Sequence, residues 1–345
     1  MSKYIFEPAT DFAFKSADYV PYKDREVCER LRKISGVDLE KHINHWTYPE
    51  FNIHVMMNPH PVLIASLFTE IKDTAARGEK CTLILGNPEP DTYIPLARLI
   101  NMYRIDCKHV NLFAMDEWAD DDGNIAPETY QAGFAHSMLK YFWAQIDEDL
   151  RMPLEQCYYP TTKNIDSYSK ILNDITEGKG ANICSSSPGW TGHMAFIDPV
   201  PDFMPAEVAF KQEYLNDKAA MDKYIEDYKK YYLTQEARIV TLHPLTVAQN
   251  SLHGVFGQSG YMQAVPPKAA TIGPVDVLRA RKRIEVHALM TNGTFSSWQR
   301  MTSRLVLHGP VCPEIPSSML QLMPTEVLVS DDLAAPFDCW EKVGY

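Results

Sequence analysis

The sequence predicts an α/β protein with three layers, in which helices cover both faces of a Rossmann-like, mostly parallel sheet. The alternation of two kinds of segment along the chain supports this fold class. Short apolar segments that end in turn residues alternate along the chain with longer segments whose apolar residues recur at helical spacing. Because parallel neighbours in a sheet are joined by crossover helices, this alternation is typical of crossover units on both faces of one sheet.

The expected elements follow one another from residue 23 onward. A helix at about 23–34 belongs to a polar N-terminal extension, residues 1–50, which is expected to wrap a single domain at 51–345. The elements expected next are a helix at 61–76, strands at 81–85 and 110–115 around a helix at 92–103, helices at 129–145 and 167–177, and a strand at 181–184. The Gly86-Asn87-Pro88 sequence ends the first of these strands.

A segment at about 200–236 differs in character and is interpreted as a helical insertion. Its aromatic residues, among them Tyr224, Tyr228 and Tyr231, recur every three or four positions and form one stripe of a helix. The stripe predicts packing on the body of the protein or on a second subunit of a homo-oligomer. The alternative is a lid over the functional site.

Composition narrows the class of partner. The 345 residues include 33 basic and 45 acidic side chains, for a net charge of −12, which disfavours nucleic acid and anionic membrane surfaces as partners. Seven scattered cysteines without a C-x-x-C pair predict neither a disulfide framework nor a structural zinc site. The N-terminus does not read as a signal peptide, and no apolar run is long enough for a membrane span. We therefore expect a soluble, cytoplasmic protein that acts on a small molecule.

Ligands of such sheets bind beyond the carboxyl ends of the strands, and two groups of candidate catalytic residues are expected there. Asp116 and Glu117 follow the strand at 110–115, and since consecutive strand residues face opposite sides, only one of them can face a given pocket. His193 stands in a glycine-containing turn, with Asp198 five residues later. An imidazole exchanges protons near neutral pH, although a histidine after glycine is also typical of a core or capping position.

Together these segments resemble the glucosamine-6-phosphate deaminase family over about residues 60–335. Met115-Asp116-Glu117-Trp118, with Pro127-Glu128-Thr129-Tyr130 downstream, is similar to the family's M-D-E-Y…P-E-S-Y signature. The sequence from Gly192 to Pro199 is similar to the family's D-G-H-I-A-F-N-E-P. The resemblance implies an isomerase–deaminase that converts an aldose amino-sugar phosphate into a ketose phosphate and ammonia, without a metal or organic cofactor.

The same resemblance implies roles for individual residues. Asp116 matches the base that removes the proton at C2 and returns one at C1, and His193 matches the group that assists ring opening. Asp198 stands where the family has a Glu that orients the imidazole, and Glu117 is taken as a further catalytic carboxylate, although its entry into the pocket is open. The residues expected to bind substrate are Gly86, Asn87, Ser187, Gly189, Thr191 and Gly192.

Departures from the family pattern concern the phosphate. Thr191 replaces an Asp of the family motif, and the first loop carries two prolines together with Glu89 and Asp91, which would repel a dianion. Leu252 stands where the family has an Arg, and the Lys expected near 291–296 is absent. The sequence thus predicts an unphosphorylated, differently substituted or cationic sugar, or a loss of catalysis. The basic residues of 279–304 could replace the lost contacts, but most of them are expected on exposed helix faces.

Two alternatives to the deaminase remain. One is the related sugar-phosphate lactonase, a hydrolase that typically shows D-E-R after its strand and a G-H-T-A-S turn. Trp118 and the Met194-Ala195-Phe196 sequence fit the deaminase pattern better. The other is a sugar-binding protein without catalysis, for which Thr191 and the altered phosphate loop are the arguments.

Overall fold

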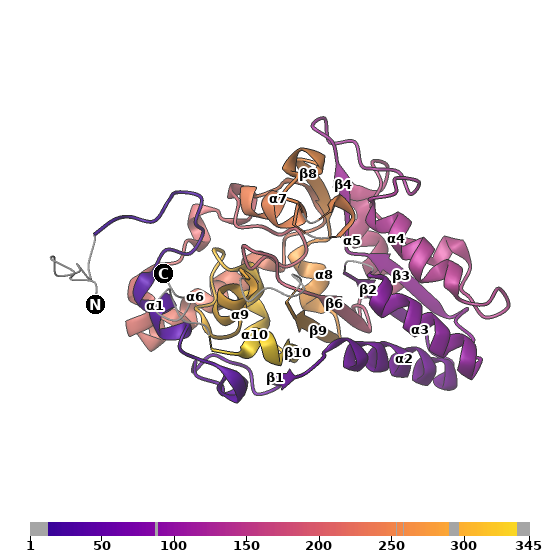
Figure 1. Cartoon of the computed structure of the whole chain (residues 1–345), viewed down its shortest axis with the longest axis horizontal. Coiled ribbons are helices and arrows are strands. Elements are labelled where there is room, and N and C mark those ends of the chain that lie inside the picture. Colours follow the sequence, from indigo (N-terminus) through magenta and orange to yellow (C-terminus); the bar gives the residue numbers. More distant parts are fainter. Residues whose placement is uncertain (1–12, 87–88, 253, 258, 290–296, 337–345) are drawn as a thin grey trace, which may run out of the picture.

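Seven strands form one parallel sheet in the order β1-β10-β9-β6-β2-β3-β5 (Figure 1). The computed structural model describes residues 13–86, 89–252, 254–257, 259–289 and 297–336. The strands of this sheet are β1 (Phe51–Met56), β2 (Cys81–Leu85), β3 (Val110–Ala114), β5 (Cys157–Tyr158), β6 (Ile183–Ser186), β9 (Lys282–His287) and β10 (Thr325–Ser330). A small antiparallel sheet of β4 (Asp116–Ala119), β8 (Lys268–Thr271) and β7 (Arg238–Thr241) adjoins it.

Alternate residues of each central strand face two separate apolar cores. Leu83 and Leu85 pack into the core formed with α2, α3 and α4, whereas Ile84 and Phe113 belong to the core formed with the remaining helices. The helices of the first face are α2 (His60–Arg77), α3 (Pro90–Tyr103) and α4 (Phe134–Tyr141). Those that contribute to the second core are α5 (Tyr168–Ile175), α6 (Lys218–Tyr232), α7 (Pro244–Asn250), α8 (Pro274–Arg279), α9 (Gln299–His308) and α10 (Asp331–Ala334). The predicted three-layer α/β/α architecture is confirmed.

Most of the predicted elements are present near their expected bounds. The strand at 81–85 and the helices at 61–76, 92–103 and 167–177 match β2, α2, α3 and α5. The prediction of a helix at 129–145 is wrong for its first part, since α4 begins only at Phe134. There the buried carboxylate of Glu117 accepts hydrogen bonds from the first main-chain N–H groups of the helix. Seven strands of the described chain were not predicted: β1, β4, β5, β7, β8, β9 and β10.

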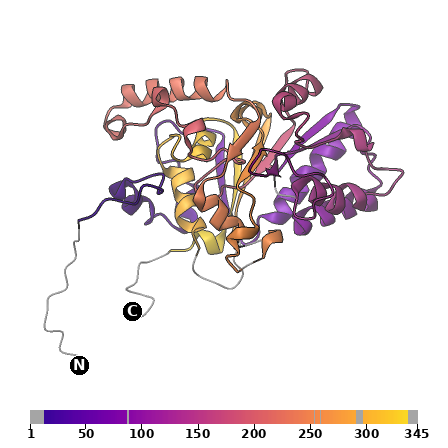
Figure 2. The same ribbon diagram turned by 90° about the horizontal axis from the view of Figure 1, so that it is seen from above.

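The N-terminal segment and the segment at about 200–236 both pack on the rest of the protein. Helix α1 (Arg25–Leu31) lies against α9, where Val27 and Leu31 share a core with Val306. In α6, Met221, Tyr224, Tyr228 and Tyr232 are buried. Helix α6 lies along one side of the molecule, in coral in Figure 2. Packing on the body therefore accounts for the aromatic stripe, and α6 contributes no residue to the large cavity described below.

Most basic residues of 279–304 were predicted to lie on exposed helix faces. For three of these residues the prediction is wrong. Arg283, Arg300 and Arg304 are buried, and Arg283 lies on strand β9. Arg304 donates hydrogen bonds to main-chain carbonyls of the N-terminal segment, of α9 and of the end of α10. These guanidinium groups hold chain segments together. No helix in the described part of the chain is both long and apolar enough to cross a membrane.

Candidate active site

Asp116 is positioned at the junction of the two sheets. Strand β3 ends at Ala114, and the chain passes through Met115 directly into β4, where Asp116 pairs with Thr271 of β8. The main-chain N–H of Phe196 donates to Oδ1 of Asp116 at 3.3 Å and to the Thr271 hydroxyl at 3.1 Å. Burial raises the pKa of Asp116 to about 7, against the opposing effects of Thr271 and His193. This carboxyl can therefore gain and lose a proton at neutral pH.

His193 is held by a fully buried carboxylate. Its Nδ1 lies 2.9 Å from Oδ1 of Asp198, which also accepts the hydroxyls of Thr191 at 2.7 Å and Thr246 at 2.8 Å. The other oxygen, Oδ2, accepts the main-chain N–H of His243 at 3.0 Å. Burial on its own would raise the pKa of Asp198, but His193 and the hydrogen-bond donors together lower it.

The ionised Asp198 also fixes the tautomer of the imidazole. An acceptor-only carboxylate requires the proton on Nδ1 of His193, which leaves Nε2 as the nitrogen that exchanges protons with a ligand. The turn is built around this ring. A Cβ atom at Gly189 would lie 2.1 Å from Nε2 of His193, so only glycine fits there. Ala195 has a left-handed φ of 55°, which costs energy in a residue with a side chain, and the amide that follows it is the one that binds Asp116.

Glu117 occupies the opposite side of the strand from Asp116. Its carboxylate is fully buried and accepts the main-chain N–H groups of Ala135 at 2.8 Å, Trp118 at 2.9 Å and Phe134 at 3.2 Å. Burial raises the pKa of Glu117 to about 7, and these amides oppose the shift. In this structure Glu117 therefore binds the N-terminus of α4, and its role as a catalytic carboxylate stays a prediction.

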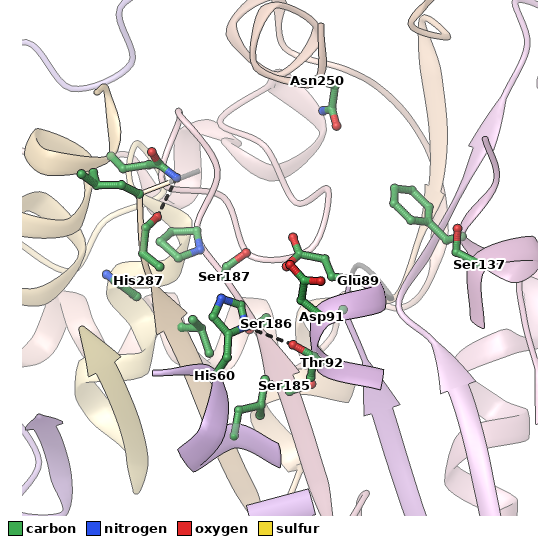
Figure 3. Close-up of a pocket in the computed structure, with 18 of the residues that line it drawn as sticks. His60, Glu89, Asp91, Thr92, Ser137, Ser185, Ser186, Ser187, Asn250 and His287 are labelled. Carbon is green, nitrogen blue, oxygen red and sulfur yellow. Dashed lines mark hydrogen bonds between the residues drawn. The ribbon is translucent and has the colours of Figure 1, made fainter. Parts of the chain in front are cut away.

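A cavity of about 530 Å³ opens at the carboxyl ends of β2, β6 and β9 (Figure 3). Of the residues expected to bind substrate, Gly86 and Ser187 line it, whereas Gly189, Thr191 and Gly192 do not, and Asn87 lies outside the described residues. The hydroxyl of Thr191 is bonded to Asp198 instead.

Asp116 and His193 are not among the residues that line this cavity. An aromatic cluster joins the two regions. Trp118 lines the cavity and packs against Phe196 at a centroid distance of 5.2 Å, and Phe196 meets the His193 ring edge-on at 5.7 Å. The cavity and the Asp116–His193 pair thus share a wall of aromatic side chains.

Sequence reasoning brought together Asp116, His193 and Asp198 but missed Thr246, His243 and Thr271. Thr246 lies on α7, His243 is the N-cap of α7 and Thr271 lies on β8. His243 is the nearest of the three in sequence, and it follows Asp198 by 45 positions. The sequence signals for them are two weak resemblances to the same family. Thr241-Leu242 with Asn250-Ser251 flanks α7, and the segment from Pro267 to Gly273 contains Thr271. Among the described residues, no group of three or more His, Cys, Asp or Glu side chains could hold a metal ion.

Comparisons with known proteins bear on the fold. No family model and no curated protein matches the sequence. Solved structures do match. A monomeric glucosamine-6-phosphate deaminase, described as a missing link of the NagB superfamily, superposes with a TM-score of 0.61 at 15% identity, over 83% of this chain and 99% of that one. A 6-phosphogluconolactonase from Trypanosoma cruzi gives 0.53 at 13% identity over 86% and 100%, and one from Plasmodium vivax gives 0.52 at 15% over 89% and 99%.

The chain has the fold of these enzymes. At such identities the likeness establishes the architecture, and it is the architecture that the sequence motifs implied. Deaminase and lactonase neighbours share it, so the choice between the two reactions depends on the residues of the site.

Proposed function

We propose that this protein is an amino-sugar isomerase–deaminase, an enzyme that transfers a proton between C2 and C1 of an open-chain amino sugar and releases ammonia. The observation that carries the proposal is the placement of Asp116, a carboxyl whose pKa burial raises to about 7, beside the His193–Asp198 pair. The family motifs that contain these residues support the same reaction.

The chemistry uses each group in turn. Nε2 of His193 exchanges a proton with the ring oxygen, which opens the sugar ring, and Asp198 stabilises the imidazolium that forms. The Asp116 carboxylate then accepts the proton from C2 while a proton of the substrate ammonium group passes to the carbonyl oxygen at C1, which gives an enolamine. The Asp116 carboxylic acid returns its proton at C1, and the product is an imine at C2. Water adds at C2 of the resulting imine and ammonia leaves, which yields the ketose. A carboxyl that titrates near neutral pH suits both halves of this transfer.

Release of ammonia and ketose from glucosamine and from glucosamine 6-phosphate tests the proposal. Asp116→Asn keeps the size of the side chain but removes the base, and we expect turnover to fall by about a thousandfold or more. Asp121→Asn, in the exposed loop after β4, is the matched control and should retain full activity. Undiminished turnover in the Asp116→Asn variant would refute the assignment of Asp116 as the base.

A lactonase activity is the second candidate, because the His193–Asp198 pair is complete without Asp116 and can take a proton from water. The two reactions make different demands on the same variants. Deamination needs both Asp116 and His193, whereas lactone hydrolysis should persist in Asp116→Asn and disappear in His193→Asn. Hydrolysis of a sugar lactone with that pattern would favour the lactonase.

A further inference from the structure

The large cavity has an unusual charge pattern for an enzyme whose fold neighbours act on sugar phosphates. Its described lining contains no Lys and no Arg. The charged or titratable side chains that line it are Glu89, Asp91, His60 and His287. Figure 3 shows the Glu89 and Asp91 carboxylates extending into the same part of the cavity, near the hydrogen bond between His60 and Thr92. Two carboxylates without a cationic partner on the wall disfavour an anion.

The N-terminus of α3, which faces this cavity, is closed to a phosphate. Helix N-termini bind anions through main-chain N–H groups that have no partner within the helix. Here Pro90 has no N–H, and those of Thr92 and Tyr93 both donate to the carbonyl of Glu89 at 3.1 Å. Burial raises the pKa of Glu89, and His60 opposes this shift. The first turn thus supplies carboxylates where an anion site would supply donors.

Ser186, at the end of β6, does not compensate. The hydroxyl of Ser186 donates to the buried carboxylate of Glu285. Beside this pair lies His287, which is 2% exposed and lines the cavity. Its Nδ1 bonds the Ser303 hydroxyl at 2.9 Å, and its Nε2 lies 3.6 Å from Oε2 of Glu285, which is longer than a hydrogen bond. Neither of these two buried atoms has a hydrogen-bond partner among the described residues. A hydroxyl group of a ligand in the cavity could complete them.

Aromatic side chains form a further part of the wall. The aromatic residues that line the cavity are Tyr93, Trp118, Phe134, Tyr141, Phe256 and Trp298. Aromatic rings attract cations over their faces and cover the apolar side of a ligand. Carboxylates, rings and an imidazole whose Nε2 lacks a hydrogen bond together suit a ligand that has hydroxyl groups and a positive charge.

We propose that the substrate is an unphosphorylated amino sugar, which is a cation at neutral pH, and that Glu89 and His287 bind its hydroxyl groups in this cavity. The inference rests on the proposed function for the reaction but concerns only the substrate class. It reverses the charge preference expected for a sugar-phosphate enzyme.

Binding is measured by calorimetry in the Asp116→Asn variant, which separates affinity from turnover. The ligands are glucosamine, glucosamine 6-phosphate and the neutral N-acetylglucosamine. We expect glucosamine to bind at least about tenfold more tightly than its 6-phosphate, with N-acetylglucosamine between them, since a charge-assisted contact is typically worth that factor. Adding Glu89→Gln should weaken glucosamine binding about tenfold and reduce its advantage over the 6-phosphate.

Glu148→Gln is the matched control, because the Glu148 side chain is 90% exposed and does not line the cavity. It should leave all three affinities unchanged. Equal or tighter binding of the 6-phosphate, or no binding of glucosamine, would overturn the inference. Glucosamine that binds as expected but yields no ammonia with intact Asp116 would support the inference on binding and refute the proposed reaction instead.

Discussion

Replacing Asp198 with Asn should show whether Asp198 and His193 form a proton-transfer pair or whether His193 only fills space in the core. In the folded protein the carboxylate accepts the imidazole N–H, two hydroxyls and one main-chain N–H, all between 2.7 and 3.0 Å. An amide has a single acceptor oxygen and turns its NH₂ group toward donors. Removing one partner of a buried charge pair costs roughly 3–5 kcal/mol, and because Asn keeps part of the network we expect a loss of about 3 kcal/mol.

Urea unfolding at pH 7 measures this loss, and ¹⁵N NMR of the imidazole should show the Nδ1–H tautomer of His193 in the natural protein but not in the variant. The pKa of Asp198 is lowered from its ordinary value of 3.8, so its stabilisation is complete above that value and is lost as the pH falls below it. The difference between the two proteins should therefore shrink below about pH 4. Thr191→Val, which removes one hydroxyl at constant shape, should cost about 1 kcal/mol. An Asp198→Asn variant as stable as the natural protein, with an unchanged tautomer, would refute the assignment.

Four further outcomes are expected. Because burial raises the pKa of Asp116 from 3.8 to about 7, its ionisation in the unfolded chain lowers the stability of the folded state as the pH rises from about 4 to 7. Asp116→Asn should therefore gain about 4 kcal/mol over the natural protein across that interval in urea titrations. Glu117→Ala leaves buried amides of α4 unpaired and should cost about 2 kcal/mol by the same method, whereas Glu117→Gln should keep catalytic activity, and its inactivity would make Glu117 a catalytic residue. Gly189→Ala places a Cβ on the His193 ring and should reduce turnover about a hundredfold or more in the ammonia assay. Arg304→Lys loses the planar fork that binds several carbonyls and should lower thermal and urea stability by about 3 kcal/mol; a change within 0.5 kcal/mol would contradict this account.

The central strands could be predicted from sequence because they are continuously apolar and end in strong turn signals. Strand β2 is buried on both faces and is followed by Gly86-Asn87-Pro88. Strand β9 carries Lys282, Arg283, Glu285 and His287 and therefore lacks an apolar run, although all but Lys282 are buried. Its charges are satisfied by tertiary contacts, such as those of Arg283 to the carbonyls of Leu278 and Pro324. The local sequence pattern contains no information about these tertiary contacts.

The residues of the candidate site likewise divide into those that local sequence predicted and those that only the fold brings together. Asp116, His193 and Asp198 stand within two short motifs, and the rule that ligands bind at strand ends leads to both. Thr246 carries no local signature, and Thr271 lies in a segment that resembles the family only weakly. Only the fold brings these two threonines to Asp198 and Asp116. The cavity wall was likewise foreseeable at Gly86 and Glu89, which follow β2, but not at His287, because β9 itself was not predicted.

Thr191 gives the departures from the family pattern a common physical reason. Its hydroxyl donates to the same oxygen of Asp198 that binds His193, so an aspartate at this position would place two carboxylates against each other in a buried site. The site thus holds one carboxylate with several neutral donors, and its negative charge is smaller than two acidic partners would give. The carboxylates of Glu89 and Asp91 lie instead on the cavity wall. Negative charge is therefore reduced around Asp198 and concentrated on the cavity wall, which is the distribution that we expect for a cationic, unphosphorylated sugar.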